Sequence, residues 1–388
     1  MVLGILAGLL WGPRMLAWDR PTRLIVELIQ VLAMPLILVS IILAVVSPAV
    51  SGSSFLKLAR LLAINTGVAL LIGLGLVKAI RPGEHFRNGL PALPPPSGVS
   101  ALGTLFEAGI PKSVLGPLTD SGTGRTLSVI CLAVFFGLAL RRNRTHSSFN
   151  SAVDLLGLAL AMLESLLRGV VELLPLAVFG VIASKVGNGH IAQFYSLFLF
   201  VLCVTLGLAA QIVWYLVRIR LGSWARPWQV VRACRDALLT ALSTASTTAT
   251  IPITLDCLTR RLGLRQESAR LGALVGTNLN NDGTALYEAV AALFVAQLAG
   301  IDLSWGQQLL MMAIAMAAAT GAAGIPEGGT VTLAMVLSSV HLPLEFLPLL
   351  LTVDWFVDRC RTMVNVFGDI NVSCLLDGKS RGSLERPT

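Results

Sequence analysis

Long apolar runs separated by short polar segments recur along the whole chain. A helix needs about 20 apolar residues to cross a hydrocarbon core of roughly 30 Å. Several stretches have about this length, for example Leu24–Val46, Leu61–Ile80 and Phe194–Val217. The pattern therefore predicts an all-α polytopic membrane protein with about eight transmembrane helices. The predicted spans lie near residues 1–17, 22–47, 56–80, 124–141, 155–186, 192–218, 268–297 and 345–376.

Two further apolar regions, 235–258 and 306–340, do not fit a simple span. Within them, Thr240–Thr254 is rich in hydroxyl groups and Ala319–Thr330 is rich in glycine, and each contains a proline. We predict that both fold as re-entrant helical hairpins. Such breaks are tolerated at membrane depth only where protein or a water-filled cavity surrounds them, and in transporters they point at substrate and ions.

The hairpin pattern occurs twice, and each time a helix with charged residues follows it. Pro252 precedes Asp282 by 30 residues, and Pro326 precedes Asp358 by 32 residues. This duplication indicates the internal repeat that is common in secondary transporters.

Composition supports the membrane assignment. Hydrophobic residues make up 55% and charged residues 13% of the chain, and the mean hydropathy is +0.79, so lipid must act as the solvent. The net charge of +8 is compatible with nucleic-acid binding, but Lys and Arg lie in short segments between apolar runs, as the positive-inside rule predicts. We therefore expect no nucleic-acid partner.

Three other features carry little functional information. The six cysteines have neither CxxC spacing nor accompanying His pairs, which indicates packing residues. Val2–Trp11 lacks a basic flank and an A-x-A site, so we expect no cleaved signal peptide, and the segment is short for a spanning helix. Arg81–Arg125 is rich in Pro and Gly, which is typical of a solvent loop.

The last predicted span carries a stripe of polar residues. Asp354, Asp358, Arg361, Asn365 and Asp369 follow one another at steps of four, three, four and four, so all five share one helix face. Charges at the bilayer centre cost at least a few kcal/mol and must face a polar cavity, a partner or a ligand. We interpret the stripe as a binding face. An internal salt-bridge network that only locks helices together is the alternative.

The preceding span contains the polar run Asn280-Asn281-Asp282-Gly283 within apolar surroundings. These residues are poor helix formers, so we expect the helix to unwind there and to form an oxygen cage for an alkali cation. A polar kink filled by water is the alternative. Glu288 lies six residues further on among apolar residues that favour its protonated form and would let it carry a proton, unless it pairs with Arg359 or Arg361.

The histidines do not indicate an enzyme. His85, His146, His190 and His341 fall near loops or span ends, and no constellation of nucleophile, base and orienting residue occurs. A channel or a non-transporting sensor is a further alternative, which saturable, sodium-dependent uptake would exclude.

Together these segments resemble the dicarboxylate/amino acid:cation symporter family, which includes excitatory amino acid transporters and bacterial glutamate/aspartate symporters. The resemblance extends from Arg23 to about Leu376. Its motifs are the second span with Pro35, Thr250-Ile-Pro-Ile-Thr254, Asn-x-Asp-Gly-Thr-Ala-Leu-Tyr-Glu at 280–288, Gly-Ala-Ala-Gly-Ile-Pro at 321–326, and Asp-Arg-x-Arg-Thr-x-x-Asn-Val-x-Gly-Asp at 358–369.

The resemblance implies the glutamate-transporter (elevator) fold, in which a homotrimeric scaffold in the cell (inner) membrane, surrounded by lipid, holds three mobile transport domains. It implies the following division of the chain: scaffold helices in 1–80 with a short first helix, an extramembrane loop in 81–123, scaffold and transport helices in 124–225, a transport core of hairpins and helices in 226–378, and a cytoplasmic tail in 379–388.

The function implied by the resemblance is symport of glutamate or aspartate driven by sodium ions. Alternatives are a C4-dicarboxylate:cation symporter and a neutral amino acid carrier of the same family. Dicarboxylate carriers of the family lack an acid at the position of Asp358, and neutral carriers lack the arginine equivalent to Arg361. Both residues are present here, which favours the acidic amino acid.

Carried over by position, Arg361 would bind the side-chain carboxylate of the substrate with help from Thr284, and Asp358 would bind its α-amino group beside Asn365. Both assignments agree with physical chemistry, since a planar guanidinium fits a carboxylate bidentately and an aspartate pairs with an ammonium group. The implied partners of the α-carboxylate are backbone groups around Thr247 and from Ile325 to Gly329, and the Thr362 hydroxyl.

The resemblance also implies several sodium sites. Their implied ligands are Asn280, Asn365 and Asp369 in one site, Asn65, Thr66, Asn280 and Asp282 in another, and carbonyl groups near Ala319, Thr320 and Ala322 in a third. Gly276 is a further implied metal ligand.

Two positions bear on coupling to other ions. Glu288 stands where sodium-only members carry Gln, so the resemblance makes proton cotransport and potassium return hypotheses for this chain. In the first hairpin, Ala245 stands where a microbial relative has an arginine. The compensating arginine of this chain is Arg359 in the last span, as in the animal glutamate carriers.

Three departures distinguish this chain from the family pattern. Asn281 replaces a methionine beside the cation sites, which affects the expected ion stoichiometry. Leu61-Leu62 replaces a tyrosine pair, and Glu327 adds a carboxylate at the tip of the second hairpin, where it would weaken binding of an acidic substrate.

Overall fold

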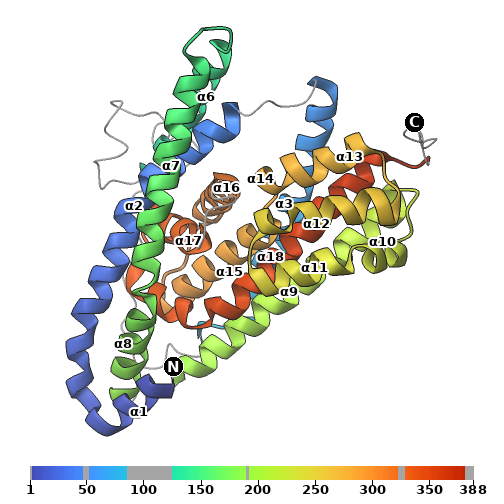
Figure 1. The fold of residues 1–388 in the computed structure, drawn as a ribbon. Coiled ribbons are helices and arrows are strands. Elements are labelled where there is room, and N and C mark those ends of the chain that lie inside the picture. Colours follow the sequence, from blue (N-terminus) through green and yellow to red (C-terminus); the bar gives the residue numbers. More distant parts are fainter. Residues whose placement is uncertain (1, 47–51, 85–124, 189–191, 322–327, 381–388) are drawn as a thin grey trace. The chain divides into compact units, whose positions relative to one another are not determined.

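The computed structural model describes residues 2–46, 52–84, 125–188, 192–321 and 328–380, and these residues form helices and no strands (Figure 1). This agrees with the predicted all-α class. The chain forms two compact units: unit one contains residues 1–47, 76–203 and 288–355, and unit two contains residues 48–75, 204–287 and 356–388.

Unit one is built around α2, which packs against α6, α7 and α8 (Figure 1). Its core includes Leu36 of α2, Val129 of α6, Leu167 of α7 and Met335 of α17. The elements of this unit are α1 (Val2–Trp11), the 3₁₀ helix η1 (Gly12–Trp18), α2 (Asp19–Val46), α6 (Arg125–Arg142), α7 (Phe149–Val171), α8 (Leu174–Gly187), α16 (Trp305–Gly321), α17 (Gly328–Ser339) and the 3₁₀ helix η5 (Leu344–Phe346).

Helices α1 and α8 approach each other closely because two glycines of α1 lie against α8. A Cβ atom on Gly8 would lie 2.7 Å from the Ala183 carbonyl oxygen, and one on Gly4 would lie 3.1 Å from the Phe179 carbonyl oxygen. This small-xxx-small spacing is typical of helix pairs in membranes, where association depends on close backbone packing.

Unit two contains shorter helices and two π-helical turns. They are α10 (Pro227–Ala233), α11 (Arg235–Thr244), α12 (Thr247–Asp256), the π helix η3 (Cys257–Leu262), α13 (Gln266–Arg270), the π helix η4 (Leu271–Val275) and α14 (Gly276–Leu279). Four longer helices contribute residues to both units: α3 (Gly52–Ile80), α9 (Ala192–Gly222), α15 (Asp282–Ala299) and α18 (Leu347–Asp377).

Most predicted spans correspond to observed helices, and three are divided. The span expected at 1–17 consists of α1 and η1. The span expected at 155–186 is split between α7 and α8 at Glu172 and Leu173, where Pro175 occupies the first turn of α8. The span expected at 268–297 is divided into α13, η4, α14 and α15. Within the described residues, three apolar helical stretches are long enough to cross a membrane: Leu56–Ile80, Phe149–Gly187 and Tyr195–Gly222.

The first predicted hairpin is a helix–turn–helix of α11 and α12. Its break lies at Ala245 and Ser246, where Ala245 adopts a left-handed conformation with φ of 51° and the Ser246 hydroxyl accepts a hydrogen bond from the Ala249 N–H. Pro252 lies inside α12 and does not end it, contrary to the expectation from sequence. In the second hairpin, α16 packs against α17, and the tip with Ala322, Ile325 and Glu327 lies outside the described residues.

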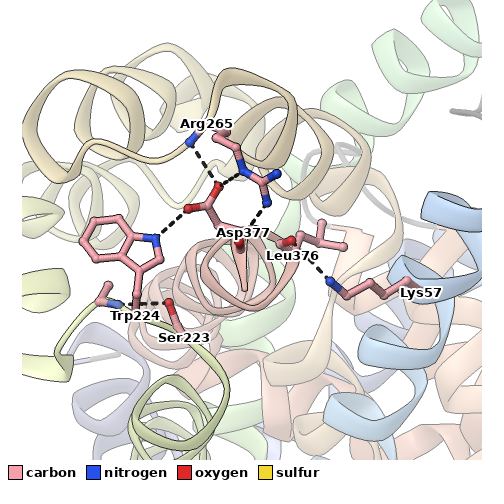
Figure 2. Close-up of polar contacts among 7 residues, drawn as sticks. Lys57, Ser223, Trp224, Arg265, Leu376 and Asp377 are labelled. Atoms are coloured by element: carbon pink, nitrogen blue, oxygen red, sulfur yellow. Dashed lines mark hydrogen bonds and ion pairs between the residues drawn. The ribbon is translucent and has the colours of Figure 1, made fainter. Parts of the chain in front are cut away.

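The C-terminal end of α18 is anchored by one buried carboxylate (Figure 2). Asp377 accepts hydrogen bonds from the Trp224 indole at 2.7 Å and from Arg265 Nε at 2.9 Å, and the Arg265 guanidinium also donates to the Asp377 carbonyl oxygen. Lys57 Nζ donates to the Leu376 carbonyl oxygen at 3.3 Å. Basic donors at the last carbonyl groups stabilise a helix C-terminus and so hold the helix that carries the polar stripe.

Replacement of Asp377 by Asn removes this ion pair, and we expect a loss of about 2 kcal/mol of unfolding free energy, the cost of a buried charged hydrogen bond. Burial by itself raises the pKa of Asp377, but hydrogen bonds from Trp224 and Arg265 outweigh it, so the pKa is lowered overall. The stabilisation is therefore complete above the ordinary carboxylate pKa of about 4 and is lost as pH falls through the lowered pKa.

The measurement is the thermal unfolding of the purified protein in detergent at neutral and acidic pH. The exposed Asp302 provides the control, since Asp302→Asn removes the same charge and should leave the melting temperature unchanged. An Asp377→Asn protein that melts like the wild type at neutral pH would contradict the anchoring role.

Candidate functional site

Most of the polar stripe predicted for the last span is buried in α18. Arg361, Asn365 and Asp369 are each at most 3% exposed, whereas Asp358 is partly exposed. These four residues belong to unit two. Asp354, the fifth member of the stripe, is also buried but belongs to unit one.

Asp358 and Arg361 form an ion pair one turn apart on α18. Arg361 Nη2 lies 2.6 Å from Asp358 Oδ1, and the Arg361 guanidinium lies over the Tyr287 ring, 4.1 Å from its centroid. A guanidinium held against an aromatic face keeps its plane and position. Because this pair lies within a single helix, it does not lock two helices together. It presents a positive and a negative group side by side.

The predicted unwinding is observed at Asn280. Helix α14 ends at Leu279, Asn280 is extended with φ of −109° and ψ of 95°, and α15 begins at Asp282. This confirms that the polar run interrupts the helix, because its side chains are poor helix formers that compete for backbone hydrogen bonds.

Asn365 of α18 ties the unwound segment to the last helix. Its Oδ1 accepts a hydrogen bond from the Gly283 N–H at 2.8 Å, and its Nδ2 donates to Asn281 Oδ1 at 3.1 Å and to Thr284 Oγ1 at 3.2 Å. A Cβ atom on Gly283 would lie 2.9 Å from the Arg361 carbonyl oxygen, so only glycine permits this approach. The unusual Asn281 is therefore a hydrogen-bond partner of Asn365.

Asp369 lies at the centre of a first cluster of oxygen atoms. Its Oδ1 accepts a hydrogen bond from Asn280 Nδ2 at 2.9 Å, and its Oδ2 accepts one from the Thr277 hydroxyl at 2.8 Å. Asn280 Nδ2 also donates to the Asn365 carbonyl oxygen, which orients the Asn280 amide. The structure thus brings together Asn280, Asn365 and Asp369, the predicted ligands of one sodium site. Gly276, which was predicted as a metal ligand without a site, lies beside Asp369.

The Asn280 side-chain oxygen in this cluster is buried and accepts no hydrogen bond from the described residues. A buried carbonyl oxygen without a donor carries an unmet interaction of about 1–3 kcal/mol. The amide turns its Nδ2, and not this oxygen, toward the Asp369 carboxylate and the Asn365 carbonyl. Rotation of the Asn280 amide would bring three hard oxygen atoms together, of the kind that alkali and alkaline-earth cations prefer.

Asp282 lies at the centre of a second cluster. Thr66 Oγ1 donates to its Oδ1 and Tyr215 Oη donates to its Oδ2, each at 2.6 Å. Asn65, which was predicted beside them, is engaged elsewhere: its Oδ1 accepts hydrogen bonds from Trp214 and Arg218. Of the predicted second site, the structure brings Thr66 and Asp282 into direct contact.

The remaining predicted residues lie at several places. In unit two, Thr247 is the first residue of α12, Thr362 is buried in α18 and Arg359 is half-buried. In unit one, Gly329 lies in the first turn of α17, Ala319 and Thr320 lie near the end of α16, and Glu288 is fully buried in α15.

Four residues of these clusters were not predicted from the sequence: Thr277, Tyr215, Trp214 and Arg218. Thr277 and Tyr215 donate hydrogen bonds to the two buried carboxylates, and Arg218 donates to Asn65. The signal for Tyr215 and Thr277 was a hydroxyl group in an apolar helix. That signal was too common along the chain to be assigned.

Comparison with known proteins identifies the family of the chain. The family model for the sodium:dicarboxylate symporter family matches residues 1–379. Excitatory amino acid transporter 4 of Mus musculus is 35% identical over 298 residues, which cover 74% of this chain and 51% of that protein, so the chain spans about half of that relative's length.

Two further relatives align over a larger share of both sequences. Excitatory amino acid transporter 1 of Ambystoma tigrinum is 29% identical over 425 residues, which cover 94% of this chain and 78% of the relative. Excitatory amino acid transporter 3 of Oryctolagus cuniculus is 29% identical over 424 residues, which cover 94% and 80%. These relatives are transporters and not enzymes by name. Since the family model covers nearly the whole chain, this multi-pass membrane protein belongs to the sodium:dicarboxylate symporter family.

Proposed function

We propose that the chain is a secondary active symporter that carries an acidic amino acid, aspartate or glutamate, together with sodium ions. The observation that carries the proposal is the arrangement on α18, where the Asp358–Arg361 pair and the Asp369 cation cluster lie on one helix and are linked by Asn365. The names of the aligned relatives, which are excitatory amino acid transporters, support the same substrate class.

The substrate is bound by exchange of ion-pair partners. Without substrate, the charges of Asp358 and Arg361 neutralise each other at 2.6 Å. An acidic amino acid offers a carboxylate to Arg361 and an ammonium group to Asp358, so both charges keep a partner of opposite sign. Thr284, fixed by the Asn365 amide, is the further side-chain partner proposed beside Arg361. The partners proposed for the α-carboxylate are those that the family pattern implies: backbone groups at Thr247, Ile325 and Gly329, and the Thr362 hydroxyl.

Sodium ions balance the buried carboxylates. A cation at the Asp369 carboxylate and the Asn365 carbonyl would take the place of the Asn280 Nδ2 donor. Rotation of that amide would turn its unpartnered oxygen toward the cation, and the cation would neutralise a charge at membrane depth. A second cation at Asp282 and Thr66, beside Asn65, does the same for the other carboxylate. The third site implied by the family, near Ala319, Thr320 and Ala322, completes the proposed set.

Asn365 couples the two kinds of ligand. Its side chain holds Gly283 and Thr284 next to the substrate pair, and its carbonyl oxygen belongs to the cation cluster. A ligand that orders one side of Asn365 lowers the cost of ordering the other, and such coupling is reciprocal. Substrate and sodium therefore raise each other's affinity.

Further properties of the proposal follow from the family. The chain assembles as a homotrimer in the cell membrane, with about eight spanning helices and two re-entrant hairpins that move the site as an elevator. Glu288 carries a cotransported proton and, together with Arg359, permits potassium return. Its complete burial is the property that such a carrier requires.

The substrate class is tested by replacing Asp358 with Ala. We expect uptake of labelled L-aspartate and L-glutamate into proteoliposomes under an inward sodium gradient to fall by at least about a hundredfold, because loss of the ammonium partner leaves a buried charge unpaired at a cost of roughly 3 kcal/mol. Asp302→Ala, which removes an exposed carboxylate, should transport like the wild type.

Succinate, which has no ammonium group, separates this proposal from its nearest competitor. An amino acid carrier should show little succinate uptake in the wild type. Succinate uptake that persists in Asp358→Ala would instead make the chain a C4-dicarboxylate carrier and leave Asp358 a structural residue.

The cation cluster is tested by replacing Asp369 with Asn. Loss of the central charge should raise the sodium concentration for half-maximal uptake by at least about tenfold, which corresponds to roughly 1.4 kcal/mol of cation binding. The concentration of aspartate needed for half-maximal uptake should rise with it, because the coupling is reciprocal. Sodium dependence equal to that of the Asp302→Asn protein would show that Asp369 binds no transported cation.

A further inference from the structure

An apolar cavity of about 560 Å³ lies within unit two, apart from the ion-binding clusters. It is bounded by α9, α10, α11 and α18, and its volume is in the range of sites that bind small molecules. A cavity without polar lining offers water no hydrogen-bond partners, so an apolar occupant is favoured. The lining residues are Ile212, Leu216, Pro227, Trp228, Val231, Leu238, Met363 and Phe367.

Arginine side chains lie where this lining reaches the ends of two helices. Arg220 follows Leu216 by four residues and therefore continues the same face of α9 near its end. Arg226 directly precedes Pro227 at the start of α10. Both arginines are exposed, so positive charge stands beside the apolar lining.

Trp228 marks the level of the membrane interface. It lines the cavity and is nevertheless 74% exposed, and it lies in α10, directly after Arg226 and Pro227. Tryptophan is enriched where hydrocarbon meets headgroups, and arginine beside it attracts the phosphates of anionic lipids. The apolar cavity, Trp228 and the arginines thus follow one another in the order in which a bilayer presents acyl chains, the interface and phospholipid headgroups.

We propose that this cavity binds one acyl chain of an anionic phospholipid whose phosphate group is held by Arg220 and Arg226. The apolar lining contributes affinity for any acyl chain, and the two arginines select the anionic headgroup. The cavity wall also reaches the ion-binding region: Phe367 packs edge-to-face on Tyr215 with ring centroids 5.7 Å apart, and Tyr215 donates to Asp282. The bound chain therefore contacts Phe367, which packs on a hydrogen-bond donor of the second carboxylate cluster.

The test measures quenching of Trp228 fluorescence by lipids that carry bromine on an acyl chain. The full chain is reconstituted in bilayers that contain either brominated phosphatidylglycerol or brominated phosphatidylcholine at equal mole fraction. The signal of Trp228 is the difference between the wild type and Trp228→Phe. We expect half-maximal quenching at a lower mole fraction of phosphatidylglycerol than of phosphatidylcholine. The ratio of these two mole fractions measures the preference for the anionic lipid, and each of Arg220→Gln and Arg226→Gln should reduce it by about fivefold.

Two controls separate a built site from general attraction to the bilayer. Arg144→Gln removes an exposed arginine from unit one and should leave the preference unchanged. Val231→Phe narrows the cavity without altering charge and should reduce the Trp228 signal with both lipids. Binding does not depend on transport, so its outcome is independent of the proposed function.

Equal quenching by the two lipids would overturn the proposal. A loss of preference for the anionic lipid in Arg144→Gln as large as in Arg220→Gln and Arg226→Gln would also overturn it. Quenching that survives Val231→Phe unchanged would show that Trp228 meets only bulk lipid. Each variant protein is first checked for a single symmetric peak in size-exclusion chromatography, and Val231→Phe keeps the test decisive if an arginine variant fails to fold.

Discussion

Buried carboxylates in apolar helices impose the strongest constraint on this molecule. Asp282 and Asp369 are almost completely buried in helices of a membrane protein, where an ion without partners costs several kcal/mol. Each is met by two donors: Thr66 and Tyr215 contact Asp282, and Thr277 and Asn280 contact Asp369. Asn280, which donates to Asp369, lies at the break between α14 and α15. Its extended backbone places the side-chain amide within hydrogen-bond distance of the Asp369 carboxylate.

The same constraint explains why α18 carries so many functions. Its polar face holds the Asp358–Arg361 pair, Asn365 and Asp369, and its C-terminal end is held by Arg265 and Trp224 at Asp377 (Figure 2). A helix anchored at its end and tied to the unwound segment through Asn365 can keep both substrate and cation ligands in register. Preorganised ligands of this kind lose little entropy on binding.

The unusual residues of the chain also become intelligible in this setting. Asn281, which replaces the methionine of the family pattern, accepts a hydrogen bond from Asn365 and so strengthens the link between α18 and the unwound segment. Ala245 occupies a left-handed turn between α11 and α12, which is more costly for alanine than for glycine. The carboxamide thus belongs to the polar network, and the strain lies at the tip of the first hairpin.

Features that depend on local spacing could be predicted from the amino-acid sequence. The apolar runs predicted the helical membrane class, the steps of three and four residues placed the polar face on the last helix, and the polar run at Asn280 predicted its unwinding, because helix period and propensity are properties of neighbouring residues. The partner of each buried charge, in contrast, became known from the folded structure. Tyr215 with Asp282, Thr277 with Asp369, and Asn65 with Arg218 are contacts between residues far apart in the chain, and they depend on how helices pack rather than on any local pattern.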